Sequence, residues 1–96
     1  MTTNTYEAIV TAYCACMLCT PGRGITASGD VPRANHTIAA PRLIPFGASV
    51  VVSGNAYVVR DRTAKRFDGR FDIYFRTHKE ARKFGIRKLT VTIITP

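Results

Sequence analysis

Acidic residues are scarce in this sequence. The 96 residues include 6 Asp plus Glu against 14 Lys plus Arg, which gives a formal charge of +8 and a pI near 10.0. Eleven of the 14 cations lie between Arg60 and Lys88, so the positive field is concentrated in the C-terminal half. Such a field attracts an anionic partner, whether nucleic acid, an acidic cell-wall polymer or a membrane surface. The alternative is a solvated basic face that only keeps the protein soluble.

Long apolar runs are also missing. No stretch approaches the roughly 20 apolar residues of a membrane span, and the short run at residues 8–10 follows no basic segment, so we predict neither a span nor a signal peptide. A chain of 96 residues, 46% of them hydrophobic, predicts one domain over residues 1–96. Without a visible export address, we expect cytoplasmic synthesis with release to the cell wall, or association with a phage.

Cysteines are few and confined to one short segment. Cys14, Cys16 and Cys19 form a C-x-C-x-x-C pattern. Three thiolates are one short of a structural zinc site, for which His36 is the nearest fourth ligand. An odd number of cysteines excludes a complete set of disulfides. We therefore favour buried thiols on a strand, with a metal site and a single disulfide as the alternatives.

The patterning that is present is typical of short strands. Alternating or β-branched runs predict strands at residues 6–16, 49–52, 56–60, 71–75 and 88–94. The turn "SGN" at residues 53–55 predicts a hairpin between the second and third of these. Glycines and prolines between residues 21 and 32 predict a loop with at most one extended piece, around Ile25.

One helix is expected, and it is about two turns long. Thr77 and Glu80 form a capping box at its start, and Gly85 is placed for a C-cap. Some six strands with one short helix favour a mainly β fold, a small closed barrel, because closure leaves no sheet edge exposed. Pattern alone does not separate an OB-like barrel from a double-psi barrel.

Two of the few carboxylates stand out by their position on predicted strands. Asp61 continues the strand face of Tyr57 and Val59, which predicts an inward side chain at the lip of the barrel. Asp72 lies opposite the apolar face of its strand and must open on a groove or on water.

Two aspartates on adjoining strands push their pKa values apart, which leaves one protonated near neutral pH and able to donate a proton to a glycosidic oxygen. The alternative is that both form structural ion pairs with arginines such as Arg60, Arg62 and Arg70.

Five segments in this order resemble the 3D domain, a family named for three aspartates. They are "TAYC" at 11–14, "ITASGD" at 25–30, "TIAAPRLIPFGASVVV" at 37–52, "VVRDRTAKRFDGRFDIYF" at 58–75 and "EARKFGIRKLTVTII" at 80–94. The resemblance covers nearly the whole chain, and its most specific part is the spacing from Asp61 to Asp72 with the following "IYF".

The 3D domain is similar to the catalytic barrel of MltA-type lytic transglycosylases. The resemblance implies a six-stranded double-psi β-barrel that cleaves the MurNAc–GlcNAc bond of peptidoglycan glycan strands, leaves 1,6-anhydromuramoyl ends and needs no metal or cofactor. By position, it implies that Asp72 is the general acid and then base, and that Asp61 is its partner. Tyr13, Thr26 and Ser28 resemble residues that line the groove in the family, and the alternative is that each is a core or loop-forming residue.

The sequence departs from the family where an aspartate is common. The segment "IAAPRLIP" has Ala39, Ala40 and Pro41 there, so the third aspartate is missing. A second hypothesis is therefore a non-catalytic wall-binding or virion-associated module that kept the barrel. Nucleic-acid binding has weaker support, because the loops lack a run of aromatic residues for base stacking.

Overall fold

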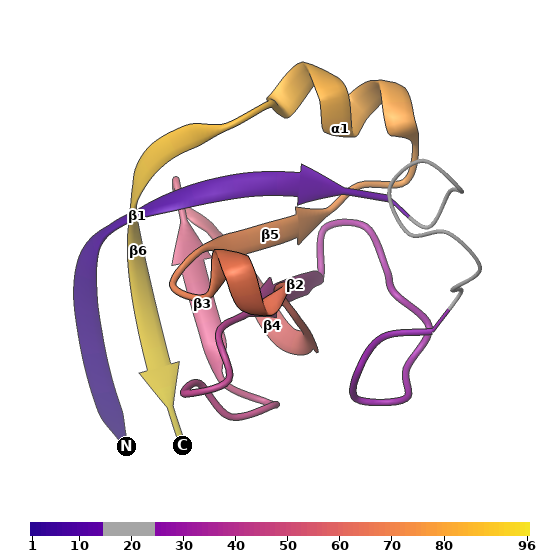
Figure 1. Ribbon diagram of the computed structural model, residues 1–96. Helices are drawn as coiled ribbons and strands as arrows, with labels where there is room; N and C mark the ends of the chain where they lie inside the picture. The colour runs from indigo at the N-terminus through magenta and orange to yellow at the C-terminus, as the bar shows by residue number, and fades with distance from the viewer. Residues whose placement is uncertain (15–24) are drawn as a thin grey trace.

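Six strands close into a barrel in the computed structural model, which describes residues 1–14 and 25–96 (Figure 1). The strands are β1 (Thr2–Tyr13), β2 (Thr37–Ala40), β3 (Ser49–Val52), β4 (Asn55–Arg62), β5 (Phe71–Tyr74) and β6 (Arg87–Thr95). The helices among these residues are a 3₁₀ turn, η1 (Lys65–Phe67), and one α-helix, α1 (His78–Phe84). This confirms the mainly β class with a six-stranded barrel and one short α-helix.

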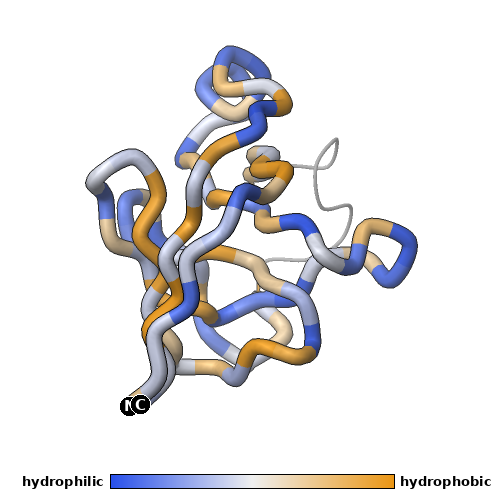
Figure 2. Tube along the Cα trace, turned by 90° about the vertical axis from the view of Figure 1, so that its left-hand side faces the viewer, coloured by the Kyte–Doolittle hydropathy of each residue, from blue (hydrophilic) through white to orange (hydrophobic). Residues whose placement is uncertain are grey.

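The order of strands around the barrel is β1, β5, β2, β4, β3, β6. Two neighbouring pairs, β1 with β5 and β2 with β4, are parallel, and the other four are antiparallel. The double-psi connection stays a prediction. Because Thr2 pairs with Thr95, the two chain ends lie side by side in both views (Figure 1, Figure 2).

Every strand contributes an apolar side chain to the core. The fully or almost fully buried members are Val10, Ile38, Val50, Val52, Val59, Phe71, Ile73, Val91 and Ile93. The predicted alternation holds in β5, where Phe71 and Ile73 are buried, and in β6, where Val91 and Ile93 are. The hydrophobic core is therefore the inside of the barrel.

Local turn and capping signals are confirmed by the structure. Ser53 and Gly54 both have positive φ, at 51° and 81°, which is the two-residue turn that joins paired strands with Val52 opposite Asn55. The Thr77 hydroxyl accepts a hydrogen bond from the Glu80 backbone N–H at 3.1 Å and so caps α1. No helix among the described residues is long and apolar enough to cross a membrane.

Strand β2 has no counterpart among the strands predicted from the pattern. All four of its residues are buried, so it carries neither an alternation nor a length that marks a strand. Residues 25–30, the described part of the predicted loop, form a bend and a turn and hold no strand. The long-range partners β4 and β5 define β2, and no local signal does.

Ile38 on β2 tests how far the barrel depends on this strand. It is fully buried between Val59 of β4 and Ile73 of β5. We expect Ile38→Ala to lower the unfolding free energy by about 2–5 kcal/mol, because it leaves a cavity in the core. Urea unfolding followed by circular dichroism measures this. Leu43→Ala is the control, since Leu43 is 93% exposed and its truncation should cost below about 0.5 kcal/mol. Equal losses for the two variants would contradict the central place of β2.

Candidate active site

The two aspartates lie in one row that crosses four neighbouring strands. Ala39 of β2 is the register partner of both Asp61 on β4 and Asp72 on β5, and Asp72 is in turn the partner of Thr11 on β1. Register partners present their side chains on the same face of a sheet. Because Ile38 and Ala40 on either side of Ala39 belong to the core, this row lies on the outer face of the barrel wall.

The prediction that the aspartates lie on adjoining strands is wrong, because β2 separates β4 from β5. Two strand spacings place the Cα atoms of Asp61 and Asp72 roughly 10 Å apart. The two residues nevertheless face one cavity, which has both among its lining residues. A methyl group, that of Ala39, occupies the wall between them.

A β-bulge sets the direction of Asp61. Between Ile38 and Ala39 the pairing with β4 steps from Val59 to Asp61, so β4 has one extra residue, Arg60. In regular pairing Asp61 would share the inward face of Val59, as its sequence position predicts. The extra residue brings Asp61 opposite Ala39 on the outer face instead. The expected inward orientation is therefore corrected by the bulge.

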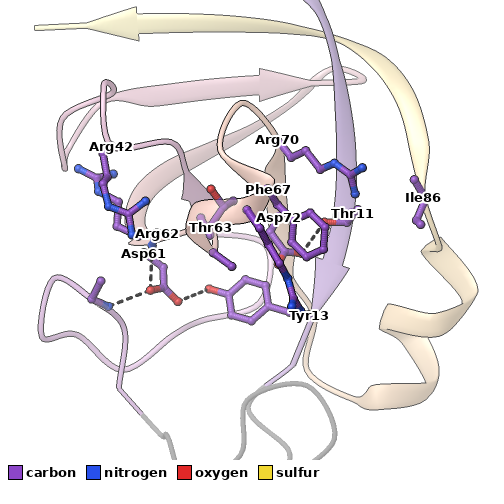
Figure 3. A pocket seen from close by; sticks show the side chains of 14 residues that line it. Thr11, Tyr13, Arg42, Asp61, Arg62, Thr63, Phe67, Arg70, Asp72 and Ile86 are labelled. Carbon is purple, nitrogen blue, oxygen red and sulfur yellow. Dashed lines mark hydrogen bonds between the residues drawn. The ribbon is translucent and has the colours of Figure 1, made fainter.

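Three donors hold the Asp61 carboxylate in place (Figure 3). The Tyr13 hydroxyl donates to Oδ2 at 3.0 Å. The backbone N–H groups of Ala27 and Arg62 both donate to Oδ1 at 2.9 Å. Together these bonds fix the orientation of the carboxylate at the cavity wall.

Asp72 is held differently and has a strongly shifted pKa. Burial raises the pKa of Asp72 from 3.8 to about 6, a hydrogen bond from Thr11 opposes the rise, and the negative charge of Asp61 adds to it. The Thr11 hydroxyl donates to Oδ1 at 3.0 Å. Asp72 therefore exchanges its proton near neutral pH while Asp61 is held by three donors. The raised pKa of Asp72 agrees with the expectation that one of the two carboxyl groups holds its proton near neutral pH, although burial rather than the neighbouring aspartate is its main cause.

Tyr13 connects the two halves of the site. Burial, followed by the charge of Asp61, raises the pKa of the Tyr13 phenol well above its ordinary value. The phenol therefore remains protonated and acts as a donor to Asp61. Its ring packs edge-on against Tyr74, with centroids 5.5 Å apart. Tyr13 lines the cavity, as the resemblance implied for a groove residue.

Thr26 and Ser28 do not line the cavity, whereas Ala27 between them does. Their hydroxyl oxygens lie 3.0 Å apart, and the Thr26 hydroxyl also accepts a hydrogen bond from the Asp30 backbone N–H. The Ser28 N–H donates to the carbonyl oxygen of Arg60 in the bulge. The two side chains thus shape the turn that aims the Ala27 N–H at Asp61.

The cavity has a volume of about 710 Å³, which is in the range of small-molecule sites. Its wall combines the four-strand row with the segment that follows β4 (Figure 3). The lining residues are Thr11, Tyr13, Ala27, Ala39, Arg42, Asp61, Arg62, Thr63, Ala64, Arg66, Phe67, Arg70, Asp72 and Ile86.

Neither Asp61 nor Asp72 forms a salt bridge with another described residue. Among the described residues the ion pairs within 4.0 Å are Arg42 with Asp68, Arg60 with Asp30 and Lys88 with Glu7. Neither Asp61 nor Asp72 belongs to one, so the alternative of structural ion pairs with neighbouring arginines finds no support in this part of the chain. Both carboxyl groups face the cavity.

The cysteine segment gives no metal centre in the described part of the chain. Cys16 and Cys19 lie outside the described residues. Cys14 is buried, with Sγ 3.9 Å from Nδ1 of His78, and His36 lies 3.3 Å from a guanidinium nitrogen of Arg33. No group of three or more His, Cys, Asp or Glu side chains suited to a metal occurs among residues 1–14 and 25–96.

Several lining residues were not predicted from the sequence. Thr11 could have been, because it lies two positions before Tyr13 on the same strand face. Arg62, Thr63 and Arg70 had no such signal, since Arg62 is the last residue of β4 and strand alternation says nothing about the segment that follows it. No protein-family model matches this sequence, and a search of curated proteins finds no match either.

The shifted pKa of Asp72 makes stability depend on pH. The folded state binds the Asp72 proton more tightly than the unfolded chain, so the unfolding free energy falls as pH rises from about 4 to about 6. Asp72→Asn removes this penalty. We expect the variant to gain about 2 kcal/mol more at pH 8 than at pH 4, relative to wild type. Urea unfolding at the two pH values measures the difference.

Glu7→Gln is the matched control for this measurement. Glu7 is an exposed carboxylate on β1, outside the cavity, and its replacement should change stability by less than about 0.5 kcal/mol at either pH. A gain for Asp72→Asn that is the same at pH 4 and pH 8 would show that Asp72 ionises in the folded protein as it does in the unfolded chain.

Proposed function

We propose that the protein is a lytic transglycosylase that cleaves the MurNAc–GlcNAc bond of peptidoglycan. The observation that supports this is the unequal pair of carboxyl groups in one cavity, with Asp72 exchanging its proton near pH 6 and Asp61 held by three donors. Glycosidic bond cleavage needs a carboxylic acid that is protonated near neutral pH.

The reaction balances without water and without a cofactor. Asp72 gives its proton to the glycosidic oxygen, and the bond from this oxygen to the anomeric carbon of the muramoyl residue breaks. The C6 hydroxyl oxygen of the same residue bonds to that carbon, and its proton passes to the Asp72 carboxylate. The acid is thereby regenerated, and a 1,6-anhydromuramoyl end is formed.

Asp61 supports the same step from two strands away. Its negative charge raises the pKa of Asp72 and faces the cavity in which positive charge develops on the sugar. The two residues line one cavity of about 710 Å³, which leaves room for a sugar ring against both. A separate water-activating base is not required, because the nucleophile belongs to the substrate.

Digestion of purified murein tests the proposal. Mass spectrometry of the soluble products should show anhydromuropeptides with wild type, a loss of at least about 100-fold with Asp72→Asn, and retained activity with Glu7→Gln. The rate should fall about tenfold per pH unit well above pH 6, because only protonated Asp72 starts the reaction. Wild-type product that forms no faster than with Asp72→Asn would refute the enzymatic function.

A wall-binding module without catalysis is the second candidate, and Ala39 is the observation that favours it. The position between Asp61 and Asp72 holds a methyl group where a third carboxylate would face both. This candidate predicts that the protein sediments with murein while no new anhydro ends appear. The same digestion therefore separates the two functions.

A further inference from the structure

Four arginines line the cavity that holds the two aspartates, and they are Arg42, Arg62, Arg66 and Arg70. Arg42 and Arg62 lie on one side of the cavity, and Arg70 lies on the other side near Thr11 (Figure 3). Three of the four guanidinium groups stack on aromatic rings. Arg62 lies 3.9 Å from the centre of the Phe46 ring, and Arg66 and Arg70 lie 4.9 and 4.7 Å from that of Phe67.

Arg62 has donor capacity that the described residues do not satisfy. Its Nη1 is buried and has no hydrogen-bond partner among them, and the same is true of Oγ1 of the neighbouring Thr63. A buried polar group without a partner is destabilising. Both residues line the cavity, so a small rearrangement of their side chains would let an acceptor bound there reach both atoms.

The electrostatic surroundings of Arg62 also favour an anion. Burial lowers the pKa of Arg62 and the positive charge of Arg42 lowers it further, while the negative charges of Asp61 and Asp68 offset part of this shift. The pair formed by Arg42 and Asp68 is half exposed and 3.8 Å long, so it neutralises this side of the cavity only weakly. A bound anion between the two guanidinium groups would relieve their repulsion, and the planar fork of arginine suits a carboxylate.

We propose that Arg62, with Thr63 and Arg42, forms a subsite for a carboxylate carried by the muramoyl unit of the substrate. This inference rests on the proposed function and deepens it, because it defines the substrate class as a glycan whose muramoyl residue bears a free acid. Two carboxylates of the wall have this chemistry, the lactyl group of a peptide-free muramoyl residue and the terminal carboxylate of a peptide trimmed to its first residue.

Binding of single sugars tests the subsite without any cleavage. The probes are N-acetylmuramic acid, its methyl ester, and N-acetylmuramoyl-L-alanine, which moves the carboxylate one residue outward. Isothermal titration calorimetry with wild type should give at least about tenfold tighter binding of one of the two acids than of the ester. The acid that binds more tightly identifies the source of the carboxylate.

Three variants assign the effect to the subsite. Arg62→Gln should reduce binding of the preferred acid to the level of the ester, and Thr63→Val should reduce it by a smaller factor. Arg82→Gln is the matched control, because it removes the same charge from α1 outside the cavity and should keep the preference. Arg62→Gln removes the unpartnered nitrogen but also the stacking on Phe46, so urea unfolding checks that this variant is folded under the conditions of the titration.

Equal binding of the acids and the ester by wild type would overturn the subsite, and so would equal effects of Arg62→Gln and Arg82→Gln. The murein digestion gives an independent result. A carboxylate preference without anhydro products keeps the subsite and refutes the transglycosylase. Anhydro products without a carboxylate preference refute only the subsite.

Discussion

The pairing of β2 with two different neighbours is the constraint on which the site depends. Its residue Ala39 faces Asp61 through a parallel ladder and Asp72 through an antiparallel one. Residues on the other side of the same strand, Ile38 and Ala40, are buried in the core. The packing that stabilises the barrel therefore also sets the spacing of the two carboxyl groups, and a single short strand links stability to chemistry.

The two carboxyl groups are of the same residue type and differ in their hydrogen bonding and burial. Asp61 accepts three hydrogen bonds, two of them from backbone N–H groups that the fold fixes. Asp72 accepts one side-chain hydrogen bond, from Thr11, and is largely removed from water, so its acid form is favoured. The bulge at Arg60 and the turn of residues 26–30 create this difference, because they bring the donors to Asp61 alone.

The sequence predicted those parts of the structure that short-range signals encode. The β3–β4 hairpin follows from its turn residues, and α1 follows from its Thr77 cap. The two aspartates could be singled out because acidic residues are rare and because Asp72 lies opposite an apolar strand face. Strand β2 and the bulge were not predictable in this way, because pairing between distant segments defines them.

Some groups of the site could not be identified from the sequence, because their positions depend on contacts between distant segments. Thr26 and Ser28 were named because they resemble groove-lining residues of the family, yet the group that reaches the site from this turn is the Ala27 backbone N–H, which any residue except proline would supply. The buried atoms of Arg62 and Thr63 that lack a hydrogen-bond partner among the described residues can be identified only from the fold, because segments distant in the sequence shield them from water. Tyr13 was named from the resemblance alone, and the structure places its hydroxyl group against Asp61.

Closure of the barrel has a consequence for how such a protein can change. Four adjoining strands supply Thr11, Asp72, Ala39 and Asp61, and a closed ladder cannot widen there without breaking its own hydrogen bonds. The arginines at 66 and 70 and the turn at 26–30 belong instead to connecting segments, which tolerate insertion and replacement. Substitutions in these connecting segments can therefore change which ligands the cavity binds, while the four-strand row that carries the two aspartates is kept in place by the barrel.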